Sequence, residues 1–218
     1  MGKYTNHIIY TNMNKEEVPS VTTIIQILNK PSLQSWANYL GFKRKNVKAV
    51  LDESARRGTL VHQLLNAYAF NKYYMYIPCQ EISKQELSSI LFRFDEWKKE
   101  YEFEPIFGEK KFSTDKYGGT VDMYCKINGK YTILDFKTSK GFYSTMFIQL
   151  SAYYMLLKEQ EFPVEQVAIL LVNSVKCEIK IIDVSELDKY CRLFNLLVDA
   201  YYEIYDLNKE WKDLLKGV

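Results

Sequence analysis

The sequence predicts an α/β fold in which a mixed central β-sheet is flanked by helices, with a helical N-terminal region before it. Three observations favour this fold class. Apolar residues recur at helical spacing in the first half of the chain, strand-like runs follow, and an almost wholly apolar helix separates three of these runs from two more. Elements in that order bury their apolar faces most economically as one sheet covered by helices.

A chain of 218 residues is expected to form one domain, since a domain commonly holds ~100–200 residues. Within it we expect a mainly helical part at 1–104, a β-β-β-α-β-β core at 105–184 and a closing helix at 185–218. The sequence shows no internal repeat and no linker rich in proline, glycine or serine.

Four helices are expected in the first part, at 21–28, 31–40, 47–70 and 83–102. Ser20 is a suitable N-cap for the first helix, and Gly41 is expected to end the second. The third helix has a stripe of small and apolar residues at i, i+3 and i+4 spacing, namely Ala55, Gly58, His62, Leu65 and Ala69. The inner face of the fourth is expected to hold Leu87, Ile90, Leu91, Phe94 and Trp97.

The core begins with three expected strands, at 106–112, 119–127 and 131–136. A turn at 115–118 joins the first two. Asn128-Gly129 joins the second and third, and this dipeptide favours a tight hairpin turn.

The rest of the core is a helix and a second hairpin. The helix at 144–158 is apolar almost all round, so it must be covered on more than one side. The runs 164–172 and 176–184 are rich in β-branched residues and are expected to pair in the centre of the sheet. Ser185 is expected to cap the closing helix, which runs to about residue 215.

Composition excludes several classes of protein. The net charge is +2, from 29 Lys+Arg and 27 Asp+Glu, which alone selects no partner. No apolar run is long enough for a membrane span, and the first residues do not resemble a signal peptide, so a cytoplasmic or intracellular protein is expected. The scattered cysteines favour reduced thiols over zinc or iron–sulfur ligands; they are Cys79, Cys125, Cys177 and Cys191.

Two aspartates are placed symmetrically about the Asn-Gly turn. Asp122 and Asp135 are equally far from its midpoint, so antiparallel pairing brings both carboxylates to the same height. Lys137 follows Asp135 at strand period and points to the same face. Carboxylates this close repel unless a cation lies between them, and hard oxygen ligands suit Mg²⁺ or Mn²⁺. Such an ion can polarise a phosphoryl oxygen and orient an attacking water.

A surface hairpin with solvated charges is the plain alternative for these residues. Asp and Lys are common, and the pattern D-x-K alone occurs by chance in many chains. Asp135, however, lies within the apolar run Ile133-Leu134-Asp135-Phe136, where a charge is costly without a partner.

Four motifs in this order resemble those of the PD-(D/E)XK nuclease superfamily, in its RecB-like exonuclease branch. They are Gly58-x-x-x-His62, Gly119-Thr-Val-Asp122, Ile133-Leu-Asp-Phe-Lys-Thr138 and Gln149-x-x-x-Tyr153. Within that branch the chain is similar to mitochondrial genome maintenance exonucleases and their phage relatives. The resemblance covers 19–184 and implies a restriction-endonuclease-like core.

The resemblance implies roles for individual residues. The metal ligands would be His62, Asp122, Asp135 and the backbone carbonyl of Phe136. Lys137 would be the catalytic lysine. Gln149 and Tyr153, one helical turn apart, would hold substrate or water near the metal, with Gln149 acting in catalysis.

Several of these residues have ordinary alternatives. A histidine on an apolar stripe can be a buried residue bonded to the backbone, and Tyr153 can be part of the core. Glu109 matches an acidic position that could help hold a second metal, although the following Lys110-Lys111 favours a solvated edge residue.

Basic clusters could follow a phosphate backbone, with Arg57 and Lys140 as substrate-binding candidates. The clusters are Lys43-Arg44-Lys45, Arg56-Arg57, Lys110-Lys111, Lys137 and Lys140. Aromatic residues near them could stack on unpaired bases, as in proteins that bind single strands; they are Phe42, Phe112, Phe142 and Tyr143.

The chain departs from the family pattern in three respects. Val121 stands where the nominal motif has proline, which does not affect the chemistry. The cysteines do not fit the layout of the branch members with an iron–sulfur cluster, so no cluster is expected. No G-x-x-x-x-G-K-[ST] loop occurs, so no nucleotide cofactor is expected, and unwinding would need a partner.

The resulting expectation is an Mg²⁺- or Mn²⁺-dependent deoxyribonuclease. Exonuclease action on single-stranded DNA, in replication, recombination or DNA repair and in a phage setting, follows from the resemblance. Possible partners are a helicase, a polymerase or a single-strand-binding protein. The alternatives are an endonuclease, an exonuclease for duplex ends, an RNA-cleaving enzyme, and a non-catalytic nucleic-acid-binding or inhibitor protein.

Overall fold

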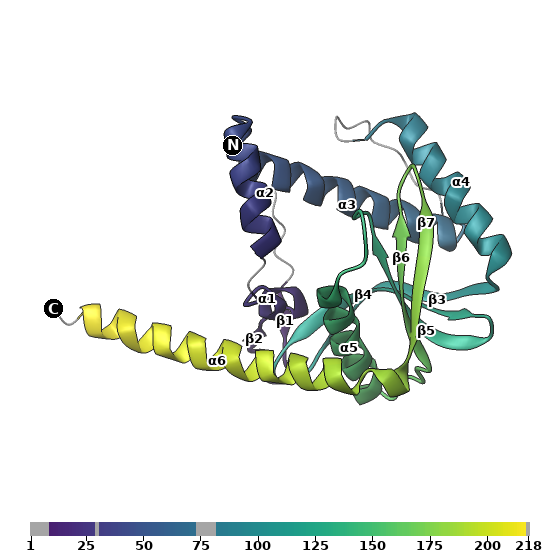
Figure 1. Cartoon of the computed structure of the whole chain (residues 1–218). Coiled ribbons are helices and arrows are strands. Elements are labelled where there is room, and N and C mark those ends of the chain that lie inside the picture. The colour runs from purple at the N-terminus through teal and green to yellow at the C-terminus, as the bar shows by residue number, and fades with distance from the viewer. Residues whose placement is uncertain (1–8, 29–30, 73–81, 217–218) are drawn as a thin grey trace.

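Five strands form one mixed sheet in the order β3-β4-β5-β6-β7 (Figure 1). The computed structural model describes residues 9–28, 31–72 and 82–216. β5 and β6 are parallel, and the other neighbours are antiparallel. The strands are Phe103–Ser113 (β3), Gly118–Ile127 (β4), Lys130–Lys137 (β5), Gln166–Val172 (β6) and Cys177–Asp183 (β7). The α/β class with a mixed central sheet is therefore confirmed.

Helices lie where the apolar spacing predicts them, with their ends shifted by a few residues. Ser20, Asn46 and Ser83 cap three of them by accepting a hydrogen bond from a backbone N–H of the first turn. The helices are Val21–Ile25 (α1), Pro31–Phe42 (α2), Val47–Ala69 (α3), Lys84–Glu100 (α4), Ser144–Glu159 (α5) and Asp188–Lys216 (α6).

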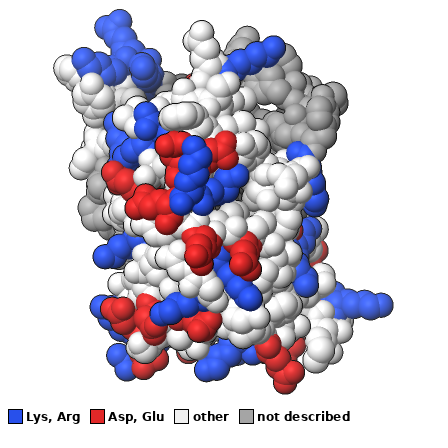
Figure 2. Space-filling model, turned by 90° about the vertical axis from the view of Figure 1, so that its right-hand side faces the viewer, with Lys and Arg blue, Asp and Glu red and all other residues white. Residues whose placement is uncertain are grey.

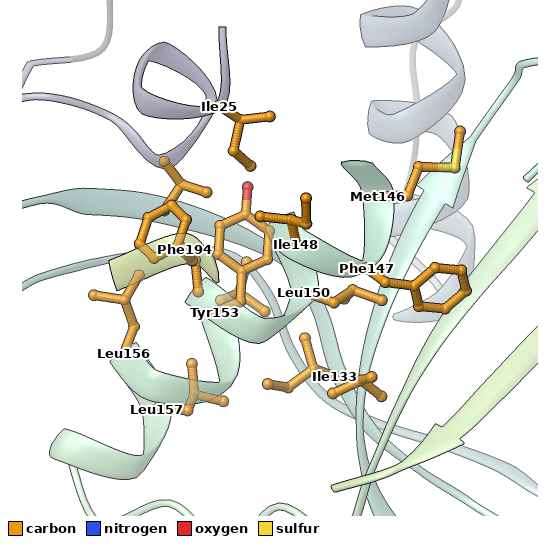
Figure 3. Close-up of a cluster of buried hydrophobic side chains, with 14 of the residues drawn as sticks. Ile25, Ile133, Met146, Phe147, Ile148, Leu150, Tyr153, Leu156, Leu157 and Phe194 are labelled. Carbon is orange, nitrogen blue, oxygen red and sulfur yellow. The ribbon is translucent and has the colours of Figure 1, made fainter. Parts of the chain in front are cut away.

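Helices cover the two faces of the sheet in separate layers. α1, α5 and α6 pack on one face in a cluster that includes Ile133 and Ile169. Figure 3 shows this cluster, in which Tyr153 of α5 and Phe194 of α6 lie among aliphatic side chains. α3 and α4 pack on the other face, against Leu134 and Phe136. As predicted, the apolar helix α5 is covered on more than one side.

In the second hairpin, β6 is central as predicted but β7 is not. Every residue of β6 is buried, whereas β7 is an edge strand with alternating exposure. A run of β-branched residues does not distinguish a central strand from an edge strand, because one buried face already favours them. The prediction that both strands are central is therefore wrong for β7.

Other differences concern helix faces and ends. On α3, Leu65 is buried but Ala55 is exposed, because the N-terminal half of this helix extends beyond the sheet (Figure 1). Gly41 lies inside α2 rather than ending it. Ser185 lies in a 3-10 turn, Val184–Glu186 (η1), that Asp183 caps, so α6 begins later than predicted.

Two short strands were not predicted from the sequence, Tyr10–Thr11 (β1) and Glu17–Val18 (β2). They pair with each other, and strands of two residues are too short to show a period. Cys79 lies outside the described residues. Within them, no helix has the length and apolar character that a membrane crossing requires.

Ile169 of β6 and Lys180 of β7 are paired in the sheet, and substituting each one tests whether β6 is central and β7 is an edge strand. Ile169 is fully buried and Lys180 is exposed. We expect Ile169→Ala to lower the free energy of unfolding in urea by about 2–5 kcal/mol, because it leaves a cavity. Lys180→Ala is expected to change it by less than about 0.5 kcal/mol. Equal effects of the two changes would contradict this burial.

Candidate active site

Asp122 and Asp135 lie where the ladder between β4 and β5 ends. Pairing runs from Ile127 with Lys130 to Met123 with Leu134, which confirms the register predicted from the Asn-Gly turn. Both turn residues have positive φ, at 51° and 78°, as such hairpins require. The aspartates occupy the next position in this register, and both are therefore at one end of the hairpin.

Beyond the last backbone pair, the carboxylate of Asp122 links β4 to β5 through a side-chain hydrogen bond. Its Oδ2 accepts a hydrogen bond from the backbone N–H of Phe136, at 3.1 Å. In an extended strand the N–H and C=O of one residue point to the same edge, so the Phe136 carbonyl also points toward β4. This is the carbonyl that the family resemblance implies as a metal ligand.

Helix α3 holds Asp122 from one face of the sheet. His62 Nδ1 lies 3.1 Å from Asp122 Oδ2, and its ring makes an edge contact with Phe136. One turn later, Asn66 Nδ2 donates to the backbone carbonyl of Asp122 at 3.1 Å. α3 therefore fixes both the side chain and the main chain of this residue.

The neighbouring strand β3 adds a second carboxylate. Gly108 pairs with Met123 and Lys110 with Val121, which places Glu109 opposite Asp122. Ligand atoms of His62, Glu109 and Asp122 all lie within 4.8 Å of one another. Glu109 is exposed, as an edge residue should be, yet it belongs to this group. Its φ of 52° is uncommon for a non-glycine residue, and such strained conformations are concentrated at functional sites.

Helix α5 reaches the site from the opposite face through a chain of polar contacts. Asp135 Oδ2 lies 2.5 Å from Lys137 Nζ, and that ammonium donates to Gln149 Oε1 at 3.2 Å. Gln149 Nε2 in turn donates to the Tyr153 hydroxyl at 2.7 Å. Both ends of the amide are thus occupied within the protein, so Gln149 orients Lys137. Asp135 lies outside the compact group of His62, Glu109 and Asp122.

Asp135 is the most buried charged residue of the site, with 1% of its surface exposed. Burial is the main cause that raises the pKa of this carboxyl to about 6, and the Lys137 ammonium opposes the shift. Among the described residues, Oδ1 has no hydrogen-bond donor. A buried carboxylate oxygen without a donor is costly, and a bound cation would satisfy it.

His62 and Asp122 stabilise each other's charged form. Burial disfavours a charged His62, but the charge of Asp122 and its hydrogen bond outweigh this and raise the pKa of the imidazole. Burial also disfavours a charged Asp122, but His62, Lys137 and the Phe136 N–H together hold the pKa of that carboxyl below its ordinary value. Asp122 therefore remains ionised at neutral pH.

These residues fit a hard divalent cation. Two carboxylates and an imidazole lie within 4.8 Å of one another, and Asp135 offers an oxygen that has no donor among the described residues. Carboxylate and carbonyl oxygens with a single imidazole suit Mg²⁺ or Mn²⁺ better than softer metals.

The N-terminal segment makes a polar contact near the site that was not predicted. The Tyr10 hydroxyl and Thr120 Oγ1 are 2.8 Å apart, and Thr120 precedes Asp122 by two residues on β4. Burial raises the pKa of Tyr10, the bond to Thr120 lowers it, and the charges of Glu109 and Asp122 raise it further. The Tyr10 hydroxyl is therefore near enough to Glu109 and Asp122 to be affected by the charge of each.

Glycines allow this close packing. A Cβ on Gly118 would lie 2.5 Å from the Tyr10 side chain, and one on Gly119 would lie 2.7 Å from the Tyr153 ring. Gly119 belongs to the Gly-Thr-Val-Asp motif, so the glycine of that motif makes room for the tyrosine of α5.

The structure does not bring all of the predicted substrate-binding residues to this site. Arg57 forms a two-pronged ion pair with Glu86 of α4. Lys140 is exposed in the segment that follows β5. Lys110 lies over the rings of Phe107, Phe112 and Phe162, and Phe112 is buried.

The basic clusters lie on different elements of the fold, namely the α2–α3 corner, α3, β3, β5 and the segment after β5. Lys43-Arg44-Lys45 lies at the corner between α2 and α3, and the length of α3 from Val47 to His62 is about 22 Å at 1.5 Å per residue. Figure 2 shows the side of the molecule on which α4 lies, where Lys and Arg are interspersed with Asp and Glu.

Four supporting residues escaped the sequence analysis: Asn66, Gly108, Tyr10 and Thr120. Asn66 lies four residues after His62 on the same helix face, a spacing that could have indicated it. Thr120 shares strand parity with Asp122 in the same way. Nothing in the sequence indicates Tyr10 or Gly108, because their role depends on how distant segments pack.

No protein-family model matches this sequence, and no curated protein matches it either.

Gly108 tests the attachment of α3 to β4. A Cβ there would lie 2.0 Å from Asn66 Nδ2 and 3.0 Å from the Asp122 carbonyl oxygen. We expect Gly108→Ala to break the Asn66 hydrogen bond and to lower the free energy of unfolding by about 1–3 kcal/mol. In the control Gly41→Ala the new methyl meets nothing within 4 Å, and replacing a helical glycine should be neutral or stabilising. Urea denaturation of both variants measures these changes. A Gly108→Ala variant as stable as the wild type would show that a methyl group at this position does not clash with Asn66.

Proposed function

We propose that this chain is a divalent-metal-dependent nuclease with a restriction-endonuclease-like core, and that it acts as an exonuclease on single-stranded DNA. One observation carries the proposal: the contact of His62 with Asp122 and the contact of Lys137 with Asp135 both lie where the β4–β5 ladder ends, and the Phe136 N–H bonds Asp122 there. This arrangement supports the four-motif resemblance, because residues of three separate motifs meet in space.

The proposed ligands of the cation are His62, Asp122, Asp135 and the Phe136 carbonyl, with Glu109 available for a second ion. Bound there, Mg²⁺ or Mn²⁺ would neutralise charge on the scissile phosphate and lower the pKa of a water. Two observations support these assignments: Asp135 Oδ1 has no donor within the described ranges, and Glu109 belongs to the group with His62 and Asp122.

Lys137 has the position of a catalytic lysine. Its ammonium is held by Asp135 on one side and by Gln149 on the other. Burial opposes its charge, but Asp135 and Asp122 outweigh that and raise the pKa of the amine, so it stays protonated. A fixed cation next to the phosphate would stabilise the negative charge that develops there. In this assignment Gln149 and Tyr153 position Lys137.

A single-stranded substrate is favoured by the segment after β5. Lys140 is exposed there, and the Phe142 and Tyr143 side chains are also accessible. A cation and two aromatic rings within six residues of Lys137 along the chain could hold a phosphate and stack on unpaired bases. DNA rather than RNA, and cleavage from an end, follow from the motif resemblance.

A gel time course on an end-labelled single-stranded oligonucleotide tests the activity. We expect stepwise shortening with Mg²⁺ or Mn²⁺, and no cleavage with EDTA. Lys137→Ala should reduce the rate about 10²–10⁴-fold, because it removes a positioned cation. Asp135→Asn should reduce it similarly, while Lys180→Ala, an exposed lysine on β7, should leave it unchanged.

Matched RNA and duplex DNA substrates run beside it would reveal a different preference. If the wild-type protein cleaves none of them with either metal, the enzyme proposal fails and a non-catalytic nucleic-acid-binding role replaces it. Thermal melts of each variant establish that it is folded.

Metal binding can be measured without activity. Mn²⁺ at about 100 times its Kd should add about 2.7 kcal/mol to the free energy of unfolding, which raises Tm by about 5–11 °C. The shift should shrink below about pH 6, because protons then compete for Asp135, whose pKa is raised to about 6, and for His62. Asp122→Asn should reduce the shift, whereas Glu104→Gln, an exposed carboxylate on β3, should not. An unchanged shift in Asp122→Asn would exclude this site.

A further inference from the structure

The C-terminal half of α6 extends away from the body of the protein (Figure 1). Two contacts with Lys116 attach α6 to the body: the Tyr202 hydroxyl donates to the Lys116 carbonyl at 2.7 Å, and Asp199 pairs with the Lys116 ammonium. All side chains from Glu203 to Trp211 are exposed. The projecting part of α6, 203–216, has a length at which isolated helices are marginal in water. Because helices in proteins gain most of their stability from packing, we expect this part to pack against a partner.

The projecting helix has an apolar stripe on the side opposite the core. Phe194 and Val198 face the core, whereas Leu196, Leu207 and Trp211 lie on the other side and are 65%, 54% and 63% exposed. The complete stripe follows helical spacing along α6: Leu193, Leu196, Ala200, Ile204, Leu207 and Trp211. A stripe of this kind, rather than scattered apolar residues, marks an interaction surface.

A row of carboxylates runs beside the stripe. Asp199, Glu203, Asp206 and Glu210 recur at i, i+4, i+7 and i+11, so they lie on one side of the helix. A second α6 packed antiparallel would place these acidic rows against each other, which is unfavourable. The stripe therefore fits a partner surface that is apolar and basic.

The corner between α2 and α3 has that chemistry. Phe42 is 84% exposed, and Tyr39 is also exposed. Lys43, Arg44, Lys45 and Lys48 are exposed around them. This basic corner and the acidic stripe of α6 are complementary in charge, and each presents large apolar side chains.

We propose that α6 of one molecule packs on the α2–α3 corner of a second copy of this chain. The contact joins two different surfaces, so each molecule has one of each free to continue, and the assembly closes into a ring or extends. The contact area of a single helix lies at the low end of specific interfaces, and association in the micromolar range is expected.

Charge reversals test the pairing by sedimentation equilibrium at rising protein concentration. Glu203→Lys with Asp206→Lys makes the stripe basic, and Lys43→Glu with Lys45→Glu makes the corner acidic. Each pair of changes alone should weaken self-association about 100-fold, because like charges then face each other. All four changes in one chain should restore it, and so should mixing the two double variants.

Two controls accompany these variants. Glu102→Lys with Glu104→Lys makes the same change of charge as the α6 reversal, but at the beginning of β3, and should leave association unchanged. Leu207→Ser with Trp211→Ser should abolish it without lowering the Tm of the monomer, since both side chains are exposed. A wild-type protein that stays monomeric throughout overturns the proposal. Association that survives the reversals, or that the four changes together fail to restore, also overturns it.

Discussion

The hydrogen bond from the Phe136 N–H to Asp122 Oδ2 is the interaction on which the site depends. It stands where the backbone ladder between β4 and β5 stops, so a side chain joins two strands that would otherwise separate. Because the strands part there, helices on both faces of the sheet can reach the same point. His62 and Asn66 come from α3, and Gln149 and Tyr153 come from α5.

Polar groups at this point are held at a cost in stability. Asp135 is buried, and one of its oxygens finds no donor in the part of the chain that the structure describes; Glu109 adopts a left-handed conformation in the middle of a strand. Neither feature stabilises the fold. The apolar clusters on the two faces of the sheet offset these costs, and they also fix the helices that carry the site residues.

The sequence predicts the local parts of this structure well. The Asn-Gly turn and the symmetric aspartates suffice for the register of β4 and β5, since a tight turn leaves one pairing that keeps the apolar faces inward. Helix positions follow from apolar spacing. What the sequence does not contain is the pairing of surfaces that are distant in the chain. Gly108 matters only because Asn66 passes close to it, and Tyr10 only because a two-residue strand lies against β4.

Asn66 and its partner Asp122 are 56 residues apart in the chain. This separation affects the order in which the parts of the site can come together during folding. The β4–β5 hairpin is local and can form early, with its two aspartates already at the same end of the ladder. The imidazole from α3 and the amide from α5 arrive only when both helical layers have packed. Local contacts close faster than distant ones, so assembly of the centre is a late event in folding. A chain that is only partly folded, for example during synthesis, therefore carries the hairpin without the helical side chains that complete this cluster.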